Sequence, residues 1–275
     1  MWKSIFLKIK CLTNLIKVVI YCYYLNFKKL LMSNKTEISV VVPVKNEAGN
    51  IDGLIKEIHK SLKNINHEII YVNDGSTDNT ELELMYNLKK DNRLRVVRHK
   101  NSQGQSAALR SGILISNSLL IATLDGDGQN NPSDLPKMIN LIKDYKNQLT
   151  LIGGVRVNRK DSKSRIWASS FAKYCRFFLL KDIHPDSGCG IKVFHKELFL
   201  RLPYFDHMHR FLSALAIREG ANVLEFNVRH RERVVGNSNY TNLGRFMVGI
   251  FDLLGVIWLR NRMPKNTSSK EILND

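Results

Sequence analysis

Short apolar runs alternate with amphipathic stretches along the first part of the chain. A β-branched run at residues 38–42 predicts a strand that ends at Pro43, and apolar residues spaced three or four apart over 51–62 predict an amphipathic helix. The pattern then repeats, with strands predicted at 69–72, 94–97, 119–124 and 149–155 and helices after the turn at 75–78, at 106–115 and at 132–141. This alternation favours an α/β fold with a mostly parallel central sheet flanked by helices.

After Arg156 the regular alternation fades. A basic, serine-rich segment at 162–180 predicts one more helix, followed by a turn at 184–188. No linker rich in proline or glycine divides the chain. We therefore expect one domain over residues 32–240, with an additional C-terminal segment at 241–275.

The C-terminal segment contains a second amphipathic pattern. Residues 246–259 are apolar apart from Asp252, and arginines flank them at 245, 260 and 262. About 20 apolar residues are needed to cross a bilayer, so this run is too short to span one. It suits an amphipathic helix at a membrane interface with arginines at its ends, while a core or oligomer helix is the alternative.

Residues 1–31 form a separate basic segment with six lysines and no acid. Lys3, Lys10 and Lys17 recur every seven residues, which favours a basic amphipathic helix on a membrane surface. The segment lacks a small-residue cleavage site, which argues against a signal peptide. The alternative is that Met32 is the natural start of the protein.

Charge narrows the classes of ligand. The formal net charge is +17, which favours polyanions such as nucleic acid, anionic lipid or phosphorylated small molecules. A nucleic-acid-binding protein is disfavoured, because the chain has no helix-turn-helix signature, ribonucleoprotein motif or zinc spacing. The four cysteines form no C-x-x-C pair and are typical of reduced thiols in a cytosolic environment.

Acidic residues follow three of the predicted strands: Glu47, Asp74 and Asp125. Ligands of open parallel sheets bind beyond the carboxyl ends of the strands, so these acids predict a site there, although Asp74 also suits a helix N-cap. Asp125 and Asp127 are separated by one glycine, which allows both carboxylates to reach one hard cation such as Mg²⁺. The loop at 101–105 contains Gly104 but no Walker A sequence, and no G-x-G-x-x-G follows the first strand.

These motifs together resemble a known family. Residues 41–47 (VVPVKNE), 72–78 (VNDGSTD), Asn101 with Gly104, and 125–129 (DGDGQ) follow in the order and spacing of the family 2 glycosyltransferases, which have the GT-A nucleotide-diphospho-sugar transferase fold. Residues 229–240 (RHRERVVGNSNY) are similar to the R-x-x-G-x-S-K/N element of the polyprenyl-phosphate, dolichol-phosphate mannose synthase-like branch. The resemblance covers roughly residues 38–262.

The resemblance implies a role for each motif residue. Lining the nucleotide-sugar pocket are Pro43, Lys45, Glu47, Val72, Asp74, Gly104 and Asp125, while Asp125, Asp127 and Gln129 hold Mg²⁺ or Mn²⁺ against the diphosphate. Lys45 stands where tyrosine is common, Asn73 replaces the first acid of a D-D pair, and Asn239 replaces a phosphate-binding lysine. The catalytic residues are Asp127, Arg156 and Arg233, and the candidates for the acceptor phosphate are Arg159, Arg210, Ser238 and Asn239.

The implied reaction displaces a nucleoside diphosphate, linked to uridine or guanosine, from a sugar. A polyprenyl-phosphate acceptor has a second pKa of about 6 and attacks without a general base. A hydroxyl acceptor in glycan or lipopolysaccharide synthesis is the alternative, and it needs a base, for which Asp186 is the spare carboxylate; otherwise Asp186 is a turn residue. A scaffold that binds nucleotide-sugars without turnover is disfavoured by the intact metal acids.

We expect the partners to be the nucleotide-sugar donor, the polyprenyl-phosphate acceptor and a membrane surface, and no nucleic acid. This places the protein peripherally at the cytoplasmic face of the membrane. A homo-oligomer and a membrane-protein partner both stay open, as do the sugar and the nucleotide.

Overall fold

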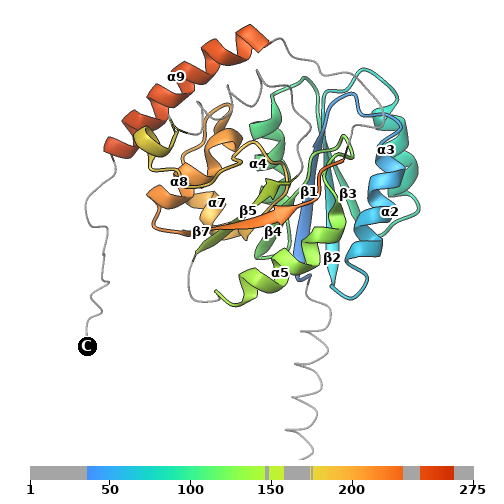
Figure 1. Cartoon of the computed structure of the whole chain (residues 1–275). Helices are drawn as coiled ribbons and strands as arrows, with labels where there is room; N and C mark the ends of the chain where they lie inside the picture. The colour runs from blue at the N-terminus through green and yellow to red at the C-terminus, as the bar shows by residue number, and fades with distance from the viewer. Residues whose placement is uncertain (1–35, 146–148, 158–173, 175, 232–241, 263–275) are drawn as a thin grey trace, which may run out of the picture. The chain divides into compact units, whose positions relative to one another are not determined.

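A seven-stranded sheet in the order β3-β2-β1-β4-β6-β5-β7 organises the part of the chain described by the computed structural model, residues 36–145, 149–157, 174, 176–231 and 242–262 (Figure 1). The strands are β1 (Ile38–Val44), β2 (His67–Asp74), β3 (Leu94–His99), β4 (Leu120–Thr123), β5 (Thr150–Arg156), β6 (Lys192–His195) and β7 (Asn222–Val228). The helices are α2 (Ile51–Ser61), α3 (Thr80–Leu88), α4 (Gln105–Ile115), η1 (Pro132–Asp134), α5 (Leu135–Lys143), α7 (Lys196–Arg201), η2 (Met208–Phe211), α8 (Leu212–Arg218) and α9 (Asn242–Asn261).

The sheet is mostly parallel, as the alternation of strands and helices predicts. β1 pairs in parallel with both β2 and β4, β2 with β3, and β5 with β7. β6 is antiparallel to both of its neighbours and inserts between β4 and β5. The predicted strand and helix positions are confirmed along 38–156, whereas β6 and β7 lie in the half for which the sequence predicts no regular alternation.

Strand β1 differs from the prediction at its end, because it passes through Pro43 to Val44. Pro43 pairs with Val72 of β2, while the ladder with β4 ends at the pair Val41–Thr123. Proline lacks an N–H group and is tolerated where one side of a strand has no ladder partner. Pro43 lies beyond the β4 ladder, so it extends the strand instead of ending it.

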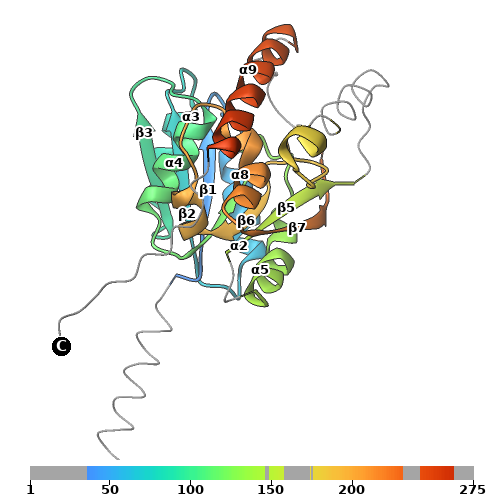
Figure 2. The ribbon, with the colours of Figure 1, turned by 90° about the vertical axis from the view of Figure 1, so that its left-hand side faces the viewer.

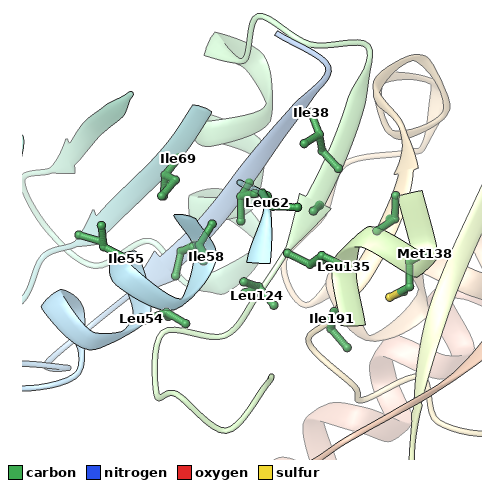
Figure 3. Packing of buried hydrophobic residues seen from close by; sticks show 14 of the residues in the cluster. Ile38, Leu54, Ile55, Ile58, Leu62, Ile69, Leu124, Leu135, Met138 and Ile191 are labelled. Carbon is green, nitrogen blue, oxygen red and sulfur yellow. The ribbon is translucent and has the colours of Figure 1, made fainter. Parts of the chain in front are cut away.

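Two apolar layers cover the sheet because neighbouring side chains on a strand point to opposite faces. Val40 and Val42 of β1 join the cluster with α2, α3 and α5, whereas Val41 joins the cluster with α4, α7, α8 and α9. Figure 3 shows the first cluster, in which residues such as Leu54 of α2 and Met138 of α5 lie over the strands. Both layers are built mostly from buried aliphatic side chains, and this packing holds the strands in place.

Helix α9 lies along the outer side of α8 (Figures 1 and 2). Val256 of α9 is fully buried, and Arg218 Nε of α8 donates to the carbonyl of Leu259 at 3.3 Å. Of the predicted helix at 162–180, residues 174 and 176–180 are described, and they are helical. Among the described residues, no helix combines the length and apolar character required to cross a bilayer.

Candidate active site

The carboxyl ends of β1, β2 and β4 meet at one edge of the sheet, because these strands are parallel. The loops after β1 and β2 are bound to each other there. Asn46 N donates to Ser76 Oγ at 3.0 Å, Thr77 N donates to Asn46 Oδ1 at 2.8 Å, and Glu47 N donates to Thr80 Oγ1 at 2.9 Å. Asn46 has a φ of 57°, a left-handed conformation that asparagine tolerates. The two loops therefore form one rigid wall beside the strand ends.

Asp74, the last residue of β2, organises the loop that leads into α4. Its carboxylate accepts hydrogen bonds from His99 Nδ1 at 2.7 Å, Ser102 Oγ at 2.7 Å, Gln103 N at 2.8 Å and Gly104 N at 2.9 Å. Burial raises the pKa of Asp74, but these hydrogen bonds outweigh it and leave the pKa below its ordinary value. The nucleotide-pocket acid of the sequence analysis thus holds Gly104, another predicted pocket residue, in place.

Asp125 and Asp127 occupy the turn that follows β4. Gln129 N donates to Asp127 Oδ1 at 3.0 Å, Asp125 N donates to Asn130 Oδ1 at 3.1 Å, and Gln105 Nε2 donates to Asp125 Oδ1 at 3.1 Å. The last of these hydrogen bonds joins Gln105, the first residue of α4, to Asp125. The loop held by Asp74 and the turn that carries the two acids are therefore neighbours.

Glycine is required between the two acids. A methyl group on Gly126 would lie 2.3 Å from Cγ1 of Val44, at the end of β1. No real side-chain contact is that short, so the turn packs against β1 only because residue 126 lacks a side chain.

The carboxylate pair fits a hard divalent cation. Burial and, to a smaller extent, the neighbouring charge of Asp127 raise the pKa of Asp125 to about 6, against the opposing effects of Lys192 and Arg156. Among the described residues, no group of three or more histidines, cysteines or acids converges on a metal site. Mg²⁺ commonly takes one or two carboxylates and completes its shell with water and substrate phosphates, so these two acids suffice.

Arg156, at the end of β5, is held by Asp186. Arg156 Nε and Nη2 donate to the two carboxylate oxygens at 2.7 Å each, and Arg156 N donates to Oδ2 at 3.1 Å. Burial lowers the pKa of Arg156, but the ion pair outweighs burial and raises it overall. Asp186, for which the sequence suggests either a spare base or a turn residue, thus fixes the orientation of Arg156.

Residues 186–192 join this ion pair to the strand that precedes Asp125 and Asp127. Cys189 N donates to the carbonyl of Asp186 at 3.1 Å, and the buried Lys192 Nζ donates to the carbonyl of Cys189. Thr123 Oγ1, at the end of β4, donates to the carbonyl of Gly190 at 2.7 Å. The turn therefore connects β4, which precedes Asp125, with the ion pair at the end of β5.

The segment that begins the 229–240 motif lies beside the turn that carries Asp125 and Asp127. Arg231 N donates to the carbonyl of Gln129 at 3.0 Å, and its guanidinium donates to both carboxylate oxygens of Glu57 at 2.9 and 2.7 Å. The structure thus brings the described start of this motif to the DGDGQ turn. The predicted site residues Arg159, Arg233, Ser238 and Asn239 lie outside the described residues.

The other predicted residues are spread more widely. Pro43 and the buried Val72 pair with each other across β1 and β2, and Lys45 is exposed just beyond β1. Arg210, in η2, has its Nη1 3.9 Å from Asp252 of α9. Arg210 therefore faces the C-terminal helix, and no described contact joins it to the metal acids.

Three residues of the site were not singled out from the sequence: Gln105, Gly190 and Lys192. Gln105 was one position outside the predicted helix. Gly190 belongs to a G-C-G sequence that follows an acid, a signal that a close backbone approach occurs there. Lys192 gave no signal, since a lysine within an apolar run usually lies at a surface.

Comparison with known proteins gives a family. The family model described as glycosyl transferase family 2 matches residues 39–202. The chain is 32% identical over 231 residues to a dodecaprenyl-phosphate galacturonate synthase of Rhizobium johnstonii, covering 81% of this chain and 67% of the relative. It is 29% identical over 221 residues to an undecaprenyl-phosphate 4-deoxy-4-formamido-L-arabinose transferase of Yersinia pestis, covering 79% and 66%. The chain therefore spans about two thirds of the length of these curated relatives.

Solved structures share the fold. Glucosyl-3-phosphoglycerate synthase from Mycobacterium tuberculosis, in complex with Mn²⁺, uridine diphosphate and glucosyl-3-phosphoglycerate, matches with a TM-score of 0.62 and 18% identity, covering 84% of this chain and 81% of the other. The same protein with Mg²⁺ and uridine diphosphate matches with a TM-score of 0.61 and 17% identity, covering 84% and 81%. At this identity the likeness concerns the fold, and it confirms the predicted GT-A architecture.

Proposed function

Because the chain belongs to glycosyl transferase family 2, we propose that it transfers a sugar from a uridine- or guanosine-diphospho-sugar to a polyprenyl phosphate. The two curated relatives are named for transfer to dodecaprenyl and undecaprenyl phosphate, and the two solved structures contain uridine diphosphate with Mn²⁺ or Mg²⁺. These names support the same donor and acceptor classes for this chain.

The observation that carries the choice of acceptor is the ion pair of Arg156 and Asp186. A hydroxyl acceptor requires a general base that is positioned to take its proton. Both carboxylate oxygens of Asp186 accept hydrogen bonds from Arg156. These contacts support a role for Asp186 in orienting the arginine. A phosphate monoester carries its negative charge before it reacts and needs no base. The arrangement therefore favours a phosphate acceptor over the hydroxyl alternative.

The residues of the site then have distinct tasks. Asp125 and Asp127 hold Mg²⁺ or Mn²⁺, which when bound offsets the charge that develops on the leaving diphosphate. Arg156, pre-oriented by Asp186, donates to phosphate oxygens of the substrate. Asp74 and Gly104 shape the nucleotide pocket through the loop before α4. Arg233 and the acceptor-phosphate candidates Arg159, Arg210, Ser238 and Asn239 complete the proposal.

A lipid acceptor also requires contact with a membrane, and two exposed apolar surfaces support peripheral attachment. Phe251, Leu254 and Trp258 on α9 are 69%, 57% and 59% exposed, and Phe177 and Phe178 are 55% and 72% exposed. The two segments adjoin, because Arg260 Nη1 donates to the carbonyl of Leu179 at 3.3 Å. Aromatic side chains with flanking arginines suit the interface of an anionic bilayer, and we place it at the cytoplasmic face.

The test is an assay of donors. Membranes that contain polyprenyl phosphate are incubated with the full-length protein, Mg²⁺ and a panel of labelled uridine- and guanosine-diphospho-sugars, and label entering the lipid phase is counted. We expect one donor to label a lipid that mild acid hydrolyses to free sugar. If no donor labels the lipid while the same donors label a water-soluble glycan, the hydroxyl-acceptor alternative replaces the proposal.

A further inference from the structure

Lys192 is a buried charge for which the proposed reaction has so far no task. It lies on β6, is 5% exposed and pairs across the sheet with Thr123, two residues before Asp125. Its ammonium group donates to the carbonyl of Cys189, and within the described residues it forms no salt bridge. An ammonium group in such surroundings costs free energy unless nearby charges offset its lost hydration.

The offsetting charges are those of the active site. Burial lowers the pKa of Lys192, whereas Asp125 and Asp186 act in the opposite direction and Arg156 adds to the lowering. The influence is mutual, because Lys192 and Arg156 also act to lower the pKa of Asp125. Lys192 is therefore buried within electrostatic range of Asp125 and of the Arg156–Asp186 ion pair.

The phosphate-site cluster consists of five side chains, three acids (Asp125, Asp127 and Asp186) and two bases (Arg156 and Lys192). Lys192 supplies one of the two positive charges among them. Removing this charge makes the cluster more negative, which favours a cation and disfavours a diphosphate.

We propose that Lys192 is a positioning residue that sets the charge of the phosphate-site cluster, weakening the binding of a cation alone and strengthening the binding of a diphosphate once the cation is bound. The inference rests on the proposed function only for the assignment of Asp125 and Asp127 as metal acids. It predicts effects of opposite sign on two ligands, which a purely structural role of Lys192 does not.

The test uses two neutral variants of the full-length protein. Lys192→Gln keeps a donor for the Cys189 carbonyl and removes the charge, and Lys192→Met removes both. Lys196→Met is the matched control, because Lys196 also donates to a backbone carbonyl, that of Ser116 at 2.8 Å, and has no described contact with the cluster. Mn²⁺ binding is measured by electron paramagnetic resonance of the free ion. Binding of pyrophosphate, UDP and GDP at saturating Mn²⁺ is measured by calorimetry.

We expect Lys192→Gln to bind Mn²⁺ alone about threefold or more tightly and to bind pyrophosphate about tenfold more weakly, since the loss of a buried positive charge strengthens the attraction of the acids for a cation and weakens the attraction of the site for an anion. Lys192→Met shifts both affinities in the same directions, and Lys196→Met leaves both unchanged. Equal or parallel changes in the two affinities, no Mn²⁺ binding by the unaltered protein, or failure of both neutral variants to fold would each overturn the proposal.

Pyrophosphate separates this inference from the proposed function. Opposite shifts for Mn²⁺ and pyrophosphate, without sugar transfer to lipid by the unaltered protein, support the role of Lys192 and reject the lipid acceptor. Transfer to lipid by the unaltered protein, with no opposite shifts in the variants, supports the proposed function and rejects the role of Lys192.

Discussion

Gly190 lies against the carboxylate of Asp125 so closely that a methyl group on its Cα would fall 2.1 Å from Oδ2. On the other side, Gln105 Nε2 donates to Oδ1 of the same carboxylate at 3.1 Å. The carbonyl of Gly190 is itself fixed by Thr123. Asp125 is therefore confined between a backbone and an amide, and the direction of this metal acid depends on a glycine 65 positions away in the sequence.

Replacing that glycine tests the confinement. In Gly190→Ala the new methyl group displaces the Asp125 carboxylate, so we expect Mn²⁺ affinity and sugar transfer to fall together by about tenfold, since displaced ligands lose pre-organisation. Mn²⁺ resonance and the lipid-transfer assay measure the two effects. Gly53→Ala is the control, because a Cβ at Gly53 in α2 meets nothing within 4 Å. It should leave Mn²⁺ affinity unchanged and stabilise the protein by up to about 1 kcal/mol. Normal Mn²⁺ binding by Gly190→Ala contradicts the prediction.

Asp186 offers a separate test of the acceptor. Asp186→Asn keeps one oxygen to accept from Arg156 but loses the charge and the second oxygen. We expect sugar transfer to fall by about 10- to 100-fold, with a higher KM for the donor, because the arginine is less well oriented. The shape of the rate against pH should stay the same. Steady-state rates from pH 5 to 9 provide the measurement.

The outcome for Asp186→Asn distinguishes the two acceptor classes. A general base contributes about 10²- to 10⁴-fold and titrates on the acidic side of the rate profile. Loss of that acidic limb in Asp186→Asn, with a rate loss near the upper end of this range, would identify Asp186 as a base and favour a hydroxyl acceptor. Asp186→Ala, which leaves Arg156 without either oxygen, should be slower than Asp186→Asn under the phosphate-acceptor proposal.

The first part of the fold could be predicted because its signals are local. From β1 to β5 each strand and helix has its own apolar period, and Asp74 and Asp125 lie at the ends of β2 and β4, which both pair in parallel with β1. The end of β1 could not be predicted from Pro43 alone, since whether a proline ends a strand depends on which side of it is paired. The pairing of β1 with β2 and β4 is set by the whole sheet and cannot be read from the residues around Pro43.

The second half depends on contacts between distant segments. β6 is four residues long and antiparallel, and its position between β4 and β5 follows from no local period. The ion pair of Arg156 and Asp186 joins residues 30 positions apart, so Asp186 looked like a turn residue in its own surroundings. Lys192 is buried only because β6 carries it into the sheet beside β4.

A buried acid at the other end of the sheet should govern stability without governing activity. Glu68, at the start of β2, accepts hydrogen bonds from Ser39 Oγ and Asn117 N at 2.6 Å and from Arg95 Nη1 at 2.9 Å. Glu68→Gln should cost about 1–3 kcal/mol of unfolding free energy at pH 7, because its amide faces groups that donate. Urea unfolding measures the cost. Glu81→Gln, in an exposed pair with Arg98, should cost less than about 1 kcal/mol.

The cost of Glu68→Gln should also depend on pH. Burial raises the pKa of Glu68, but the hydrogen bonds from Ser39, Asn117 and Arg95 outweigh it, so the folded-state pKa lies below the ordinary 4.5. The carboxylate therefore stabilises the fold fully above pH 4.5, and this contribution is lost as the pH falls through the lower folded-state value. The unfolding free energies of the unaltered protein and of Glu68→Gln should therefore converge at acidic pH. A difference that stays constant from pH 7 to pH 3 contradicts the role of the charge.

The exposed face of α9 gives the last prediction. Changing Phe251, Leu254 and Trp258 to serine removes three large apolar side chains that are more than half exposed. If they enter a bilayer interface, binding to vesicles of phosphatidylglycerol and phosphatidylcholine should fall by at least tenfold, because each buried side chain contributes about 1.5–3 kcal/mol. Vesicle co-sedimentation measures binding, and transfer to polyprenyl phosphate in membranes should fall in parallel.

The matched control changes apolar residues on another helix. Leu82→Ser with Tyr86→Ser removes side chains on α3 that are 70% and 58% exposed, and it should leave vesicle binding unchanged. Equal vesicle binding by the α9 variant and the unaltered protein contradicts the prediction. If the α9 variant instead loses self-association in analytical ultracentrifugation while its vesicle binding persists, the face belongs to an oligomer interface, because the same three side chains then cover a second copy of the chain.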